Sequence, residues 1–139
     1  EKDGISLDGT PIDLRKIAIP TYFISTREDH ITPWKSNYSG FKLMSGPSRY
    51  VLGGSGHIAG IINPPIKNKY NYWTNNTIED TPETWLENAE SHEGSWWPDW
   101  QNWIKPHAGK KVPARKPGQK LKEIEAAPGS YVKERIVPE

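Results

Sequence analysis

Two residues of this 139-residue chain have the types and surroundings that acid–base chemistry needs. Asp29 lies in STREDHITPW (residues 25–34), and His57 lies in GGSGHIAGIINPP (residues 53–65), directly after a glycine-rich turn. A carboxylate beside an imidazole fixes the ring tautomer and stabilises the protonated ring, so the imidazole can serve as general base for a nucleophile. We therefore predict that Asp29 and His57 are catalytic, provided that the fold brings them together.

The same residues also have structural interpretations. A histidine in a glycine turn is commonly solvated, Asp29 could be a turn residue before a helix, and Glu28 beside it could be the acid instead. We interpret His30 as structural, since side chains of neighbouring residues point in different directions. His92 and His107 lie in polar surroundings without partners at metal-ligand spacing, so we expect no metal site.

The elements that must position the pair are two short strands and a helix. Residues 17–26 (IAIPTYFIST) are rich in β-branched and aromatic residues and predict a buried strand, and residues 48–54 (SRYVLGG) predict a second. Between them, Thr32 is the expected N-cap of a helix that has Pro33 in its first position and ends near residues 45–47. Strands that alternate with a helix favour a parallel α/β sheet, whose loops at the carboxyl ends of the strands carry functional groups.

The rest of the chain predicts further helices and a tail. Residues 68–76 indicate a loop, Thr81 and Pro82 open a helix of about ten residues, and residues 94–104 place tryptophans at helical spacing. Core packing is the favoured interpretation of these tryptophans; a contact surface for a hydrophobic partner and a nucleic-acid site are the alternatives. After Lys105 the chain is rich in proline, glycine and lysine, which indicates an extended or poorly ordered tail.

Composition excludes several classes of protein. The formal net charge of +1 argues against a dedicated nucleic-acid binder, although residues 106–139 carry eight basic against four acidic side chains. No apolar run approaches the length of a membrane span, and the polar N-terminal residues do not match a signal peptide. The absence of cysteine excludes a disulfide framework and fits a cytoplasmic origin.

The nucleophile is missing from the pattern. In α/β-hydrolases the chain order is nucleophile, acid, histidine, yet no G-x-[SC]-x-G elbow precedes Asp29. Ser55 stands only two residues before His57 and not in an elbow between a strand and a helix. We therefore expect the chain to be the C-terminal part of a longer enzyme and to be inactive in isolation.

Five motifs resemble a known family. REDHITPW, VLGGSGHIAGIINPP, KNKYNYWTN, GSWWPDW and APGSYVK together resemble the C-terminal region of class I polyhydroxyalkanoate synthases, in family order and over nearly the whole chain. The resemblance implies an α/β-hydrolase core with a Cys–Asp–His triad. It assigns the catalytic aspartate to Asp29 in REDH and the catalytic histidine to His57 in SGHIAG, with the cysteine upstream of this region.

The resemblance also implies an activity and an organisation. Such enzymes polymerise (R)-3-hydroxyacyl-CoA, typically 3-hydroxybutyryl-CoA, into a polyester and release coenzyme A; the thioester is the substrate, and we expect no cofactor. Residues 1–105 would be the C-terminal part of the catalytic domain, and residues 106–139 a basic tail. We expect a homodimeric, cytoplasmic full-length enzyme at the surface of polyester granules, with no nucleic acid partner.

Two alternatives stay open from the residues. Another α/β-hydrolase, such as an esterase or depolymerase with an upstream serine, would pass the acyl group to water. A non-catalytic granule-binding module would instead use the tryptophan segment and the tail, and its binding would survive mutation of Asp29 and His57.

Overall fold

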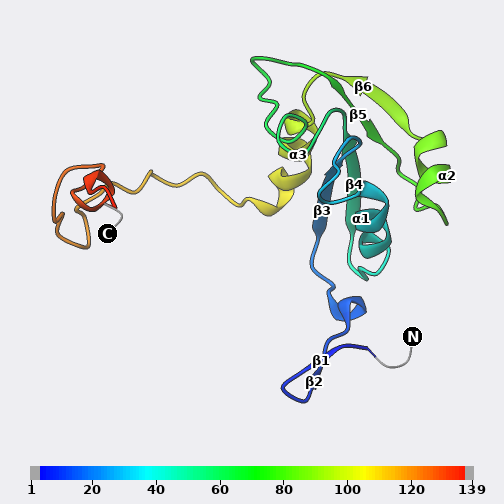
Figure 1. The fold of residues 1–139 in the computed structure, drawn as a ribbon, viewed down its shortest axis with the longest axis horizontal. Coiled ribbons are helices and arrows are strands. Elements are labelled where there is room, and N and C mark those ends of the chain that lie inside the picture. The colour runs from blue at the N-terminus through cyan, green and yellow to red at the C-terminus, as the bar shows by residue number, and fades with distance from the viewer. Residues whose placement is uncertain (1–3, 137–139) are drawn as a thin grey trace. The chain divides into compact units, whose positions relative to one another are not determined.

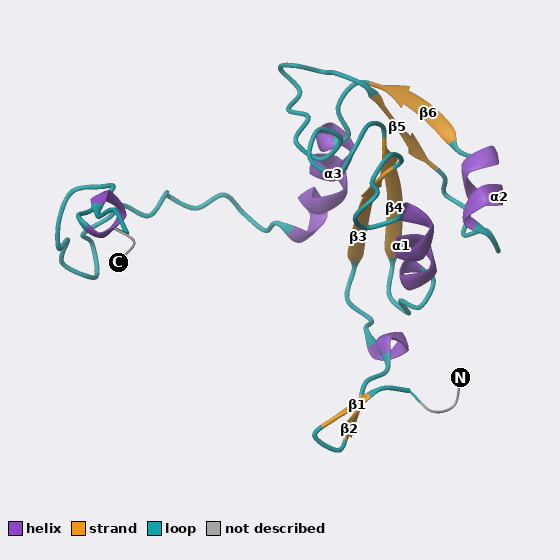
Figure 2. Ribbon diagram, in the orientation of Figure 1, coloured by secondary structure: helices purple, strands orange, loops and turns teal. Residues whose placement is uncertain are grey.

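The computed structural model describes residues 4–136, which form two compact units that divide between Ala108 and Gly109 (Figure 1). The first unit contains a four-stranded sheet with the strand order β3-β4-β5-β6, and helices α1, α2 and α3 (Figure 2). In the described residues no helix has both the length and the apolar character needed to cross a bilayer.

The centre of the first unit is a parallel pair of strands. Strand β3 (Thr21–Thr26) pairs with β4 (Ser48–Gly53) along its full length, from Thr21 opposite Ser48 to Thr26 opposite Gly53. Helix α1 (Trp34–Phe41) connects the two strands. The two predicted strands and the helix between them are therefore confirmed, and so is the parallel direction of this pair.

The sheet continues with an antiparallel pair that the sequence analysis did not predict. Strand β5 (Asn71–Thr74) lies antiparallel to β4, and β6 (Glu90–Glu93) lies antiparallel to β5. The predicted loop at residues 68–76 was wrong for Asn71–Thr74, because these polar-aromatic residues gain hydrogen bonds from β4 and β6; residues 68–70 and 75–76 lie outside helices and strands, as predicted. The observed α/β fold is thus built on a mixed sheet and not on a purely parallel one.

Two helix starts behave differently. Helix α2 (Pro82–Glu87) begins as predicted, because the Thr81 side chain accepts a hydrogen bond from the backbone N–H of Thr84 at 3.1 Å. The helix is shorter than expected, since β6 follows it. Thr32 was wrongly predicted as the N-cap of α1: the helix begins at Trp34 after Pro33, and the Thr32 hydroxyl donates to a carboxylate instead.

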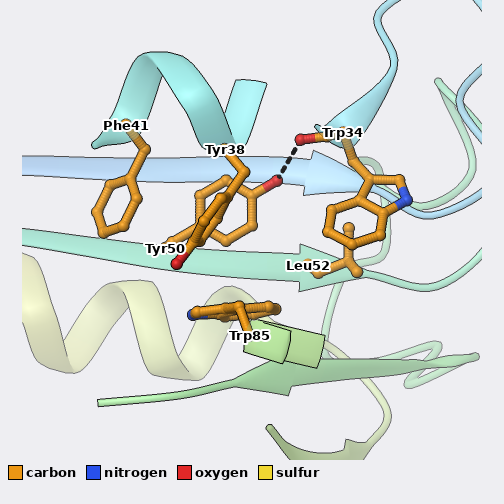
Figure 3. Close-up of a cluster of buried hydrophobic side chains, with 6 residues drawn as sticks. All are labelled: Trp34, Tyr38, Phe41, Tyr50, Leu52 and Trp85. Atoms are coloured by element: carbon orange, nitrogen blue, oxygen red, sulfur yellow. Dashed lines mark hydrogen bonds between the residues drawn. The ribbon is translucent and has the colours of Figure 1, made fainter. Parts of the chain in front are cut away.

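One face of the sheet carries an aromatic core (Figure 3). Helix α1 places Trp34, Tyr38 and Phe41 at helical spacing against the sheet. They pack with Tyr50 and Leu52 of β4 and with Trp85 of α2, all at most 8% exposed. The Tyr50 hydroxyl donates to the Trp34 carbonyl at 3.0 Å, so the polar end of this buried ring has a partner.

The opposite face is more polar. Because side chains alternate along a strand, Tyr22 and Arg49 point away from the aromatic core, toward helix α3 (Trp97–Ile104). Asp99 of α3 accepts hydrogen bonds from the Tyr22 hydroxyl at 2.8 Å and from the Arg49 guanidinium at 2.6 and 2.9 Å. A half-buried ion pair and a tyrosine therefore attach α3 to the parallel strands.

Short elements flank the sheet region in sequence. Strands β1 (Ser6–Leu7) and β2 (Thr10–Pro11) form a hairpin, and short 3-10 helices cover Leu14–Lys16 and Lys105–His107. The second unit contains one such helix, Tyr131–Lys133, and most of its described side chains are exposed. Assignment of residues 1–105 and 106–139 to a catalytic domain and a tail stays a prediction.

Candidate active site

The loops that follow β3 and β4 continue the pairing of these strands. The N–H of Arg27 donates to the Gly53 carbonyl at 2.9 Å, and the N–H of Glu28 donates to the Ser55 carbonyl at 3.0 Å. These bonds hold the loop with Asp29 beside the loop with His57. Both loops leave the carboxyl ends of parallel strands, as expected, so the two side chains meet at the same rim.

Asp29 and His57 are in direct contact. The Nδ1 of His57 lies 2.7 Å from the Oδ2 of Asp29. Since an ionised carboxylate only accepts hydrogen bonds, Nδ1 carries the proton in this pair. The Asp29 side chain is 5% exposed and the imidazole is 44% exposed, so the acid is shielded while the ring faces outward.

The Asp29 carboxylate is held from its own loop as well. Its Oδ1 accepts from the backbone N–H groups of Ile31 and Thr32, both at 2.9 Å, and its Oδ2 accepts from the Thr32 hydroxyl at 2.7 Å. These hydrogen bonds hold the pKa of Asp29 far below its usual range, although burial opposes the shift. The Thr32 N–H has the largest effect on this pKa, and the contact with His57 adds to it. The acid is therefore charged at every pH at which an imidazole titrates.

Two glycines of this segment, Gly54 before His57 and Gly60 after it, allow close approach between backbone segments. A Cβ on Gly54 would lie 2.6 Å from the Asn71 side chain, and one on Gly60 would lie 2.4 Å from the Gly54 carbonyl. The left-handed residue of this turn is Ser55, with φ of 69°, and not one of its glycines. The expected sharp turn is present, but the glycines permit it by leaving room, while the serine takes the strained conformation.

The remaining candidates lie outside the pair. Glu28 joins the site only through its backbone N–H, and His30 is exposed. His92 lies 2.8 Å from the Thr74 hydroxyl, and His107 packs on Trp103. Over residues 4–136, no group of three or more metal-ligating side chains comes together.

The sequence analysis missed the residues that fix the far end of the His57 loop. Asn63, 4% exposed, accepts from the N–H of Lys69 and donates to the carbonyls of Lys69 and Gly94. Ser95, also 4% exposed, donates through its hydroxyl to the Asn63 carbonyl. The sequence shows only an asparagine directly before two prolines here, and nothing in it indicates that this side chain is buried.

The fold and the pair together define an α/β protein with an acid–histidine dyad at the carboxyl ends of two parallel strands. No family model matches the chain. It is 53% identical over 130 residues to the poly(3-hydroxyalkanoate) polymerase subunit PhaC of Rhizobium etli, covering 93% of this chain and 20% of that protein.

Two further relatives carry related names. The subunit PhaC of Cupriavidus necator is 48% identical over 131 residues, which cover 93% of this chain and 22% of that protein. Poly(3-hydroxyalkanoate) polymerase 1 of Ectopseudomonas oleovorans is 41% identical over 135 residues, which cover 96% of this chain and 24% of that protein. The chain is therefore homologous to the C-terminal part of the poly(3-hydroxyalkanoate) polymerases, and it spans about one-fifth of the length of these relatives.

Proposed function

We propose that this chain supplies the acid and the general base of a polyhydroxyalkanoate synthase of class I. The complete protein would polymerise (R)-3-hydroxyacyl-CoA, with 3-hydroxybutyryl-CoA as the expected monomer. The observation that carries the proposal is the 2.7 Å contact between Asp29 and His57, in a chain whose relatives are named polymerases.

The nucleophile would be a cysteine thiol outside this sequence, because the chain has no cysteine. The Nε2 of His57 takes the thiol proton, and the thiolate attacks the thioester carbonyl of the substrate. The new acyl–sulfur bond forms as the bond to coenzyme A breaks, and the leaving thiolate takes the proton back from the imidazolium. Asp29 keeps the proton on Nδ1, so that Nε2 is the basic nitrogen, and stabilises the charged ring.

Chain extension would use the same base a second time. The 3-hydroxyl of one acyl unit loses its proton to His57, with Asp29 supporting the ring, and the oxygen attacks the carbonyl of an acyl-cysteine. The ester bond forms as the acyl–cysteine thioester breaks, and the leaving cysteine thiolate takes the proton back from the imidazolium. The freed thiol accepts the next acyl group, so each added monomer releases one coenzyme A in the acylation step. Neither step needs a cofactor, since the thioester supplies the driving force.

The surroundings of the enzyme follow from its product. An insoluble polyester collects the growing chains, so we propose that the full-length enzyme works at the surface of the polymer granule. Its cytoplasmic location and homodimeric state are proposed from the family resemblance. Its partners are then the acyl-CoA substrate and the granule.

The test uses the full-length protein that contains this chain, in its wild-type form and with His57→Ala. We expect coenzyme A release from 3-hydroxybutyryl-CoA with insoluble polyester in the wild type, and a loss of at least about a thousandfold in the variant, because the general base is removed. His92→Gln is the matched control, since His92 contacts Thr74 in another part of the sheet.

The outcomes separate the candidate functions. Release of coenzyme A without polymer would indicate a thioesterase-like hydrolase and would contradict the synthase. A folded protein that binds polyester but releases no coenzyme A would indicate the granule-binding module. Equal activity in His57→Ala would remove His57 from the mechanism. Turnover by residues 1–139 alone would exclude an upstream nucleophile.

A further inference from the structure

The His57 loop contains a short turn whose carbonyl groups have indole partners. The N–H of Gly60 donates to the Gly56 carbonyl at 2.9 Å, and the N–H of Ile62 donates to the Ile58 carbonyl at 2.8 Å. The turn around His57 is therefore bonded within itself. A turn this short leaves its last carbonyls without partners from its own backbone.

Two tryptophans supply the missing donors. The indole Nε1 of Trp96 donates to the Gly60 carbonyl at 3.2 Å, and that of Trp97 donates to the Ile61 carbonyl at 3.0 Å. Both acceptors follow His57 by three or four residues. Because the turn is bonded within itself, fixing residues 60 and 61 also fixes the backbone at residues 56–58.

The tryptophans are in turn anchored to the strand that leads to Asp29. The Trp96 ring stacks on Tyr22 of β3 with ring centres 6.1 Å apart and an interplanar angle of 27°. The Tyr22 hydroxyl donates to Asp99, two residues after Trp97 on the same helix. Contacts therefore link β3 through the Trp96–Asp99 segment to the His57 turn. The loop that carries Asp29 follows β3 directly, so both members of the dyad are positioned from the same strand.

We infer that Trp96 and Trp97 are positioning residues for His57, acting through their indole N–H groups as a clamp on the turn. This inference rests on the proposed function, since it concerns the general base of that reaction. The clamp keeps Nδ1 of His57 within hydrogen-bonding distance of Asp29, and an error of about 1 Å in such a geometry can cost a hundredfold in rate. Neither tryptophan reaches the reacting atoms in this role.

The test replaces the donor and keeps an aromatic ring. Trp96→Phe and Trp97→Phe are compared in the full-length enzyme with Trp100→Phe, whose ring is 41% exposed on the same helix. We expect kcat for coenzyme A release to fall about tenfold to a hundredfold in the first two, with KM within about twofold, and no change in the control. Trp97→His, which restores an N–H donor, should recover part of kcat.

A double-variant cycle separates positioning from general loosening. In an Asp29→Asn background the dyad is already broken, so Trp97→Phe should change kcat by less than about twofold there. Equal losses in both backgrounds would overturn the inference, and so would wild-type kcat in Trp96→Phe and Trp97→Phe. A loss that Trp97→His fails to recover would also count against it.

A readout independent of turnover keeps the two proposals distinguishable. NMR of labelled imidazole nitrogens reports whether the proton of neutral His57 resides on Nδ1, and Trp96→Phe and Trp97→Phe should convert a single tautomer into a mixture. If the wild-type enzyme releases no coenzyme A, the proposed function fails and this spectrum alone decides: a mixture supports the clamp, and an unchanged spectrum overturns it.

Discussion

The two faces of the parallel strand pair are held by different kinds of contact. On the α1 face, six buried side chains form the aromatic core, in which Tyr50 meets Tyr38 and Trp85 nearly edge to face, with ring centres 5.1 and 5.0 Å apart. On the α3 face, the Tyr22 ring packs against Trp96 and Trp103, and directed polar contacts are added: the Arg49–Asp99 pair, the Tyr22 hydroxyl and the indole donors of the clamp.

This difference assigns separate tasks to the two faces. Burial of apolar rings contributes stability but is nearly indifferent to direction, since neighbouring rings can repack. Hydrogen bonds between charged or indole donors and fixed acceptors need defined distances and angles, and they orient the groups that they join. We therefore expect the α1 face to contribute most of the stability, and the α3 face to set the geometry of the dyad.

The largest effect on stability is expected from Trp85→Ala. Trp85 is 1% exposed in the aromatic core, so its truncation leaves a cavity and should lower the free energy of unfolding by about 3–5 kcal/mol. Urea unfolding measures the loss. Trp100→Ala on the α3 face is the matched control; an equal loss there would break the distinction between the faces.

A smaller effect is expected from Asp99→Asn. The substitution keeps the shape but removes the charge, and it leaves the Arg49 guanidinium half-buried without its carboxylate. We expect a loss of about 1–3 kcal/mol in the free energy of unfolding, together with reduced kcat, because α3 carries the clamp. Asp13→Asn, in an exposed pair with Arg15, is the control and should change neither quantity. Loss of stability without loss of kcat would uncouple α3 from the dyad.

The smallest effect concerns the acid dependence of stability. The pKa of Asp29 is lower in the folded chain than its ordinary value of 3.8, mainly because of the Thr32 N–H, so its unfolded form binds the proton more tightly. The stabilising contribution of Asp29 is therefore complete above that ordinary value and is lost as the pH falls below it toward the folded pKa.

Unfolding midpoints measured between neutral and acidic pH test this contribution. In Asp29→Asn the unfolding midpoint should fall less steeply as the pH is lowered. In Thr32→Val the change in this pH dependence should be smaller, because the two backbone donors to Asp29 remain. If the unfolding midpoint of Asp29→Asn falls with acid pH as steeply as that of the wild type, other carboxylates govern the loss of stability in acid.

Residues with strong local patterns were predictable. The apolar runs that became β3 and β4, the spacing of Trp34, Tyr38 and Phe41, and the cap at Thr81 all express preferences that act within a few residues. The dyad was predictable for a similar reason: loops at the carboxyl ends of adjacent parallel strands must share a rim, and both candidates stand in such loops.

Residues whose structure depends on partners far along the chain were not predictable. Strand β6, Glu90–Glu93, is polar throughout and exists only because β5 offers it hydrogen bonds. Thr32 is a local exception: it left its expected capping role because the Asp29 carboxylate, only three residues earlier, offered a charged acceptor at 2.7 Å. Trp96 and Trp103 pack against Tyr22 and Trp97 donates to the His57 turn, while Trp100 is 41% exposed, so the packing interpretation holds for only part of this segment.

By itself, the sequence determined the parallel strand pair, the helix between its strands and the two loops that carry Asp29 and His57, because short-range periodicity and turn chemistry encode them. Only the tertiary structure decided that β5 and β6 extend the sheet, that Ser55 takes the left-handed position, and that indole groups hold the His57 turn. Those features arise from hydrogen bonds and close approaches between segments tens of residues apart, where no local preference selects the partner.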